Sequence, residues 1–231
     1  LLVTTEGTKS VLKVDVYLGT VVQRIPTGQR VSHMLAYHPS GQRAFVSNLG
    51  SASVSLLDIK NGDLLAFKGS GAGAEGIALS GDGRNLWVTN REEGSVSLFD
   101  GQHLTLRDKV EVAGFPIRAE LTPDDRFLLV ISAKSATLTV IDNQTLTLIK
   151  QIDINLSQSE QAADTLFADK MAGSSVPIGV EIAPDGNRAW IAHAGVDRVQ
   201  EIDLQSWETL RIFATGREPD GMAYSALELS P

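Results

Sequence analysis

The stretch that decides the fold is residues 86–100, LWVTNREEGSVSLFD, in which a polar turn joins two alternating apolar runs. The second run ends in an aspartate, and the same pattern ends in aspartate at Asp15, Asp58, Asp100, Asp142 and Asp203. The intervals between these positions are 43, 42, 42 and 61 residues. Self-similarity at such a period predicts a repeat architecture in which each repeat is one small structural unit.

Each unit contains four short runs rich in β-branched residues, separated by turns of Gly, Pro, Asn and Asp such as Ala183-Pro184-Asp185-Gly186. No helical period is visible in these units. Four strands in about 42 residues is the size of a propeller blade. The aspartate after each third strand suits a turn that it caps with its own carboxylate, and this reading is favoured over metal ligation. We therefore predict an all-β fold, a β-propeller of four-stranded antiparallel blades.

The two ends of the chain complement each other in this repeat. Residues 1–30 contain only three β-runs, and Pro219-Asp220-Gly221-Met222-Ala223-Tyr224-Ser225 aligns with the first strand of the preceding unit, residues 177–183. We predict five blades in one domain, 1–231, closed by the C-terminal strand in the N-terminal blade. The alternative is a part of a larger, seven-bladed-type ring. The predicted boundaries are blade 1, 219–231 with 1–30; blade 2, 31–73; blade 3, 74–115; blade 4, 116–152; an insertion, 153–176; and blade 5, 177–218.

Composition narrows the functional classes. The 231 residues carry a formal charge of −8, which makes nucleic acid an unlikely partner. The absence of cysteine excludes disulfides and thiol nucleophiles. No apolar run reaches the roughly 18 residues that a membrane-spanning helix needs, so no membrane span is expected. No Walker loop, Gly-x-Ser-x-Gly elbow or His-Glu-x-x-His pattern is present.

The runs Leu86–Asn90 and Ser95–Asp100 and the turn 183–186 resemble the YVTN β-propeller repeat family, and the resemblance covers nearly the whole chain. It implies a secreted, periplasmic or cell-surface protein. Some better-known relatives are lactonases or redox enzymes that carry a propeller. Their functional residues have no counterparts that can be placed in this chain position by position.

Antiparallel strands place the insertion on the same face of the ring as the ends of the second strands, at Thr5, Asn48, Asn90, Ser132 and His193. Irregular loops around a channel mouth are the expected place for binding. Within the insertion, residues 157–173 have a capping box, an apolar stripe and a terminal glycine, which predict a helix. It either packs on the rim or covers the mouth as a lid or docking element.

Charged and imidazole side chains near the axis supply the candidate binding residues. First strands must crowd the axis, so bulky charged groups there need partners. Arg118, with Glu120 and Glu181, is either a structural ion pair or a site for a charged ligand. The full set of binding candidates is His33, Glu75, Arg118, Glu120, Glu181, His193 and Asp220.

Two classes of function remain open from the sequence. The first is a non-enzymatic cell-envelope or secreted propeller, a scaffold that binds a protein, peptide, glycan or small ligand at the mouth bearing the insertion. The second is a propeller enzyme, either a lactonase-like metal-dependent hydrolase or part of a redox system. For the enzyme, His33, Glu75, His193 and Asp220 would supply metal or acid–base groups, since imidazole and carboxylate serve both. Alone, His193 is better explained as a hydrogen-bonding residue in place of Asn.

Overall fold

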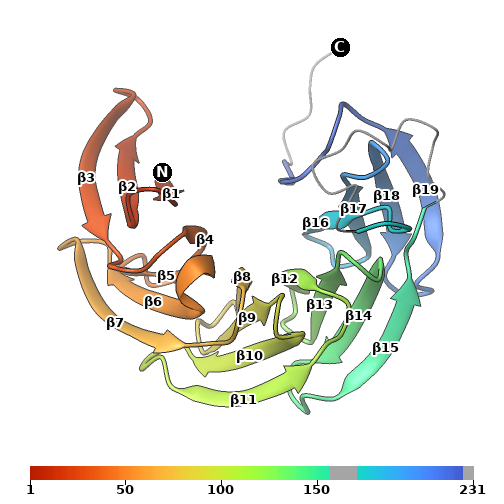
Figure 1. The fold of residues 1–231 in the computed structure, drawn as a ribbon, viewed down its shortest axis with the longest axis horizontal. Helices are drawn as coiled ribbons and strands as arrows, with labels where there is room; N and C mark the ends of the chain where they lie inside the picture. The colour runs from red at the N-terminus through yellow and green to blue at the C-terminus, as the bar shows by residue number, and fades with distance from the viewer. Residues whose placement is uncertain (157–170, 226–231) are drawn as a thin grey trace.

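The structure is a computed structural model that describes residues 1–156 and 171–225, and its regular secondary structure is almost entirely β. Figure 1 shows sheets arranged around a centre, with one strand of each sheet innermost. The first sheet contains β1 (Leu2–Thr5), β2 (Ser10–Asp15) and β3 (Thr20–Pro26). The second contains β4 (Ser32–Tyr37), β5 (Arg43–Asn48), β6 (Ser53–Asp58) and β7 (Asp63–Gly69), with the 3-10 turn Leu49–Ser51 between β5 and β6.

The next three sheets repeat the second. They are β8 (Ala74–Leu79), β9 (Asn85–Asn90), β10 (Ser95–Asp100) and β11 (Leu106–Glu111); β12 (Pro116–Leu121), β13 (Phe127–Ser132), β14 (Thr137–Asp142) and β15 (Leu148–Asp153); and β16 (Pro177–Ile182), β17 (Arg188–His193), β18 (Arg198–Asp203) and β19 (Thr209–Ala214). Neighbouring strands in every sheet pair antiparallel in chain order. The predicted all-β propeller with five blade sheets is therefore confirmed.

The core lies between blades, because strand side chains alternate between two buried faces. In β9, Leu86 and Val88 pack against the second sheet, whereas Trp87 packs against the fourth. Four apolar clusters of this kind join each sheet to the next one along the chain. The outermost strands are largely exposed, including apolar side chains such as Ile149, Leu210 and Ile212.

The aspartates that end the third strands cap their turns as predicted. Oδ1 of Asp58 accepts hydrogen bonds from the backbone N–H of Lys60 (2.8 Å) and of Asn61 (2.9 Å). The same two bonds recur at Asp100, Asp142 and Asp203. These donors lower the pKa of each of the four carboxyls, although at Asp100 burial opposes them most strongly.

The predicted closing strand is absent from the part of the chain that the structure describes. Residues 219–225 form no strand, and the first sheet has three strands instead of four. The segment lies against blade 5, where the N–H of Tyr224 donates to Oε1 of Glu181 (3.0 Å) and the Tyr224 ring stacks on Trp190. Figure 1 shows why: the arc of five sheets stays open between β1 and β16.

The predicted helix of 157–173 lies largely outside the described residues. Of its last residues, Met171 is buried in the cluster between blades 4 and 5, and Gly173 has the positive φ of a turn. No helix in the described ranges is both long and apolar enough to cross a membrane.

Candidate functional site

The innermost strand of each four-stranded sheet carries a β-bulge near its start. The pairing register shifts between Ser32 and Leu35 in β4 and between Ala74 and Ile77 in β8. It shifts again at the equivalent places in β12 and β16. A bulge places two residues opposite one and re-aims a side chain. The bulges therefore set the directions of His33, Glu75 and Arg118 at the centre of the arc.

These side chains meet in a chain of charged contacts. Nδ1 of His33 lies 2.7 Å from Oε1 of Glu6, and Nε2 lies 3.4 Å from Oε1 of Glu75. The other carboxylate oxygen of Glu75 accepts from Nη1 of Arg91 at 2.6 Å. Arg118 extends the chain, with Nη1 3.6 Å from Glu75 and Nη2 3.0 Å from Oδ1 of Asp220.

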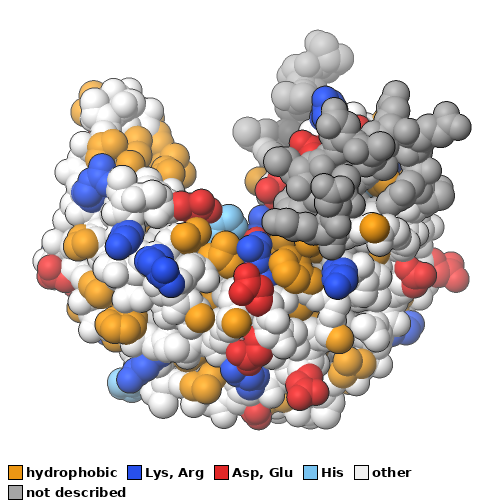
Figure 2. Space-filling model, viewed as in Figure 1, with side chains coloured by type: hydrophobic (Ala, Val, Ile, Leu, Met, Phe, Trp, Pro, Cys, Tyr) orange, Lys and Arg blue, Asp and Glu red, His pale blue; other side chains and the backbone are white. Residues whose placement is uncertain are grey.

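We call Glu6, His33, Glu75, Arg91, Arg118 and Asp220 the axial cluster. It joins groups from the first four sheets and from the segment after blade 5. Glu75 is 4% exposed, so its charge depends on these partners. Figure 2 shows histidine, acidic and basic side chains gathered at the bottom of the hollow that the arc encloses.

The contacts of the axial cluster favour the protonated form of the His33 imidazole. The hydrogen bond with Glu75 is the largest effect and raises the pKa of His33; burial opposes it, and the bond with Glu6 adds to it. When His33 is protonated, it and the two guanidinium groups equal the three carboxylates of the cluster in number, and the cluster is then close to neutral as a whole.

Two of its nitrogens have no hydrogen-bond partner although they are buried. They are Nε of Arg91 and Nη1 of Arg118. The Arg91 guanidinium also lies over the Phe115 ring, 5.1 Å from its centroid. Buried polar groups in native proteins are nearly always satisfied by protein, water or a ligand. Nη1 of Arg118 keeps only its ion-pair contact with Glu75 at 3.6 Å, and the Arg91 guanidinium is held to Glu75 through its Nη1.

Glu120 and Glu181 form a second acidic pair beside the cluster. Burial and the neighbouring charge of Glu181 raise the pKa of Glu120 to about 8, against a hydrogen bond from the Ile182 N–H that lowers it. Oε2 of Glu120 is buried and has no hydrogen-bond partner. The sequence placed Arg118 with these two carboxylates, but its partners in the structure are Glu75 and Asp220.

His193 lies in a separate buried network. Its Nδ1 is 2.9 Å from Oγ of Ser175, and its Nε2 is 3.1 Å from Oε1 of Gln200. Asn90, at the same repeat position, bridges Ser70 and Ser97 in the same manner. Burial lowers the pKa of His193 to about 4, so it is a neutral residue that takes the place of an asparagine.

Comparison with known proteins places the chain in a family. The family model for YNCE-like β-propellers matches residues 44–169, more than half of the 231 residues. The chain belongs to the YNCE-like β-propeller family. The matched range runs from β5 past β15, so it includes Glu75, Arg91 and Arg118 of the axial cluster.

A solved structure supports the fold of this YNCE-like chain. Kuenenia stuttgartiensis hydrazine synthase superimposes with a TM-score of 0.66 at 16% sequence identity, covering 95% of this chain and 84% of that one. At this identity the likeness concerns the fold alone. No curated protein matches the chain.

Two members of the axial cluster, Glu6 and Arg91, escape the sequence reasoning. Both directly follow the last residue of a second strand, Thr5 and Asn90, where the repeat turns at the channel mouth. That shared repeat position is the signal that would have found them. Among the described residues, no group of three or more His, Asp or Glu is arranged to hold a metal ion. The proposed set of His33, Glu75, His193 and Asp220 is divided between the axial cluster and the buried network.

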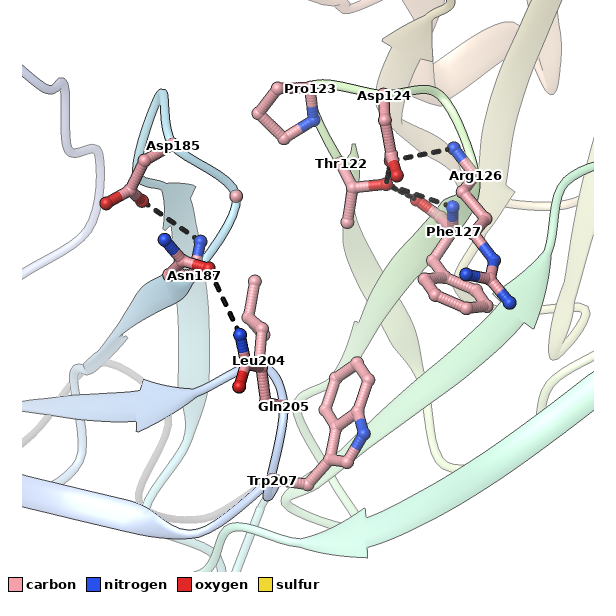
Figure 3. Close-up of a pocket in the computed structure, with 11 residues that line it drawn as sticks. Thr122, Pro123, Asp124, Arg126, Phe127, Asp185, Asn187, Leu204, Gln205 and Trp207 are labelled. Carbon is pink, nitrogen blue, oxygen red and sulfur yellow. Dashed lines mark hydrogen bonds between the residues drawn. The ribbon is translucent and has the colours of Figure 1, made fainter.

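A cavity of about 550 Å³ lies on the opposite face, between turns of blades 4 and 5. Figure 3 shows its polar residues bonded to one another: those of blade 4 within one turn, and Asn187 of blade 5 both to Asp185 and to Gln205 of the neighbouring turn. Asp124 accepts from Thr122 Oγ1 (2.6 Å), and Asp185 accepts from the Asn187 N–H (3.0 Å). Trp207 and Phe127 supply much of the apolar lining. Because the carboxylates of this cavity are used in turn capping, we assign the cavity no function.

Proposed function

We propose that the chain is a non-enzymatic β-propeller scaffold that binds its ligand at the axial cluster, on the mouth that carries the insertion 153–176. The observation that supports this most directly is the axial cluster itself, where the partly exposed side chains of His33, Arg91 and Arg118 meet from three blades. These groups are held in place by their contacts with neighbouring blades. A site that is fixed in this way loses little side-chain entropy on binding.

The ligand that suits these residues is polar and uncharged. The charges of the cluster are already paired with one another, so an ionic ligand would have to displace an existing partner. The exposed parts of the Arg91 and Arg118 guanidinium groups can instead donate to hydroxyl or carbonyl oxygens, as in a glycan or a peptide backbone. A hydrogen bond from a charged donor contributes about 1.5–3 kcal/mol, so two of them matter for affinity.

We also propose a secreted or periplasmic location and a single domain over residues 1–231. The support is the likeness of the repeats to YVTN sequences, with Leu86–Asn90 and Ser95–Asp100 as the clearest instances. The formal charge of −8 opposes binding to nucleic acid.

The test is a binding screen by calorimetry with neutral oligosaccharides, acidic oligosaccharides and peptides. We expect a neutral ligand whose affinity changes little between 50 and 300 mM salt, since no ion pair is formed. Arg118→Met should weaken its binding about 10-fold or more, the loss of one bond to a charged donor.

Arg126→Met is the matched control, because Arg126 lines the groove on the opposite face. Its guanidinium lies over Phe127 and contacts no member of the axial cluster. Equal affinity of the two variants for every ligand would contradict the proposed site. Preference for acidic ligands with strong salt dependence would contradict the proposed ligand chemistry.

A further inference from the structure

A cavity of about 610 Å³ lies between blades 3 and 4, on the mouth that carries the insertion. We call it the mouth groove. Its volume falls within the range of about 300–1,000 Å³ that is usual for small-ligand sites. One wall comes from the turn between β9 and β10 and from β11, and the other from the segment before β12 and the turn between β13 and β14. Blades 3 and 4 each pack against a blade on either side, so the groove belongs to the interior of the repeat array.

The turns that border this groove differ from the other turns between second and third strands at one repeat position. The second residue after the second strand is glycine in blades 1, 2 and 5, where it is Gly7, Gly50 and Gly195. It is Glu92 in blade 3 and Lys134 in blade 4, and both line the mouth groove. At this position, therefore, long charged side chains stand in the two blades that form the groove.

The neighbouring residue of blade 3 makes room for its charged side chain. In blade 2 a Cβ at Gly50 would lie 2.8 Å from Cγ2 of Val31, the residue before the innermost strand. In blade 3 the residue before the innermost strand is Gly73, and a Cβ there would lie 3.0 Å from Cγ of Glu92. The side chain and the glycine have exchanged positions between the two blades. Glu92 is thus accommodated by a compensating change in the next segment.

Three charged groups of the mouth groove are available to a ligand. Within the described residues, the exposed side chains of Glu92, Glu111 and Lys134 have no hydrogen-bond or ion-pair partner. In contrast, Nζ of Lys109 donates to Oε1 of Glu93 at 2.6 Å. The groove therefore presents both free acceptors and a free donor to the same space.

Arg91 joins the mouth groove to the axial cluster. Its Nη1 donates to Oε2 of Glu75 at 2.6 Å, and its guanidinium lies 5.1 Å from the centroid of the Phe115 ring. Both Arg91 and Phe115 line the groove. The ion pair and the ring together hold the guanidinium in place. A ligand that contacts Arg91 at the axial cluster can therefore continue past it into the groove.

The lining of the mouth groove suits sugar hydroxyls better than the side chains of a peptide. A hydroxyl both donates and accepts, so it can bond to a carboxylate and to an ammonium group at once. Ligand side chains that are apolar need apolar pockets, and here Ala113 and Phe115 are the apolar side chains of the lining. The C–H face of one sugar ring requires only a small apolar surface of this kind.

We propose that the ligand of the axial cluster is a neutral oligosaccharide of at least two sugar units, and that its second unit occupies the mouth groove. The proposal rests on the proposed function and goes further, because it selects a glycan over a peptide and gives the ligand a direction. Glu92 and Glu111 accept hydrogen bonds from hydroxyl groups of the second unit, and Lys134 donates to one. Phe115 contacts the C–H face.

The test compares sugars of one, two and three units by calorimetry, with neutral oligomers of glucose, mannose and N-acetylglucosamine as probes. For the wild type, affinity should rise more than about 10-fold from one unit to two, because the second unit adds hydrogen bonds to charged groups. Glu92→Ala and Lys134→Ala should each reduce the affinity for two units about 10-fold and leave the affinity for one unit unchanged. Lys60→Ala is the matched control: it removes an exposed lysine from a turn on the opposite face and should change neither affinity.

The outcomes separate this proposal from the proposed function. Affinity that does not depend on length, or groove variants that bind two units as tightly as the wild type, would overturn the second subsite. Arg118→Met would still weaken binding in that case, and the proposed function would stand. Binding of peptides with no binding of any of the three sugar series would overturn the choice of a glycan. If Arg118→Met left every affinity unchanged, the axial site itself would be wrong.

Discussion

Replacing Glu120 by glutamine should make the protein more stable at neutral and alkaline pH. The folded-state pKa of Glu120 is raised from 4.5 to about 8, chiefly by burial and next by the charge of Glu181. Because the folded state binds this proton more tightly than the unfolded state, ionisation destabilises the fold as pH rises from 4.5 towards 8. A shift of this size corresponds to a destabilisation on the order of 5 kcal/mol above pH 8, reduced if the carboxylate turns toward solvent.

Glutamine has nearly the shape of glutamate and cannot ionise, so the variant avoids this loss of stability. Urea denaturation at pH 5, 6, 7 and 8 measures the free energy of unfolding of the variant and of the wild type. The stability difference between Glu120→Gln and wild type should grow by roughly 1 kcal/mol for each pH unit above 5. Glu208→Gln, at an exposed position between β18 and β19, is the control for replacing a surface carboxylate. If the curves for Glu120→Gln and wild type run parallel from pH 5 to 8, the buried carboxyl does not titrate as argued.

Three further predictions concern the repeat. Ser132→Asn should stabilise the fold by about 1 kcal/mol in urea, because Ser132 and Thr139 bury unpaired hydroxyls where Asn90 of blade 3 bonds two serines; a destabilised variant would show that blade 4 has no room for the amide. Gly76→Ala should cost about 1–3 kcal/mol in the same assay, since its Cβ meets backbone atoms at 2.7 and 2.9 Å, and an unchanged midpoint would rule out this steric reading. Asp58→Ala should lower the melting temperature more at pH 7 than at pH 2.5: its lowered carboxyl pKa gives stability that is present above pH 3.8 and lost as pH falls through the folded-state value. Equal losses at both pH values would assign the effect to packing instead of the charged cap.

The repeat is the part of this protein that its sequence makes predictable. Turn aspartates such as Asp58 depend on local hydrogen bonds, and these are encoded within a few residues. The positions of His33, Glu75 and Arg118 near the axis also follow from the repeat, since a bulge recurs at the same place in each innermost strand.

The partners of these side chains are harder to predict. Arg118 bonds Asp220, which is 102 residues away, and the sequence offered Glu120 and Glu181 as equally plausible partners. The choice depends on how neighbouring blades are rotated relative to one another. That rotation comes from the packing of the apolar side chains between them, which no local pattern records.

Ring closure fails for the same reason. Residues 219–225 match an innermost strand in type, and the match identifies what the segment would pair with. It does not say whether the two ends meet. That depends on the angles between neighbouring sheets, which the packing of the apolar clusters sets.

The described sheets differ in the number of neighbours that they pack against. The sheets β4–β7, β8–β11 and β12–β15 each pack against two others, whereas β1–β3 and β16–β19 each pack against one, so in this chain local unfolding should begin in those two. Amide hydrogens of the first sheet should exchange before those of β8–β11.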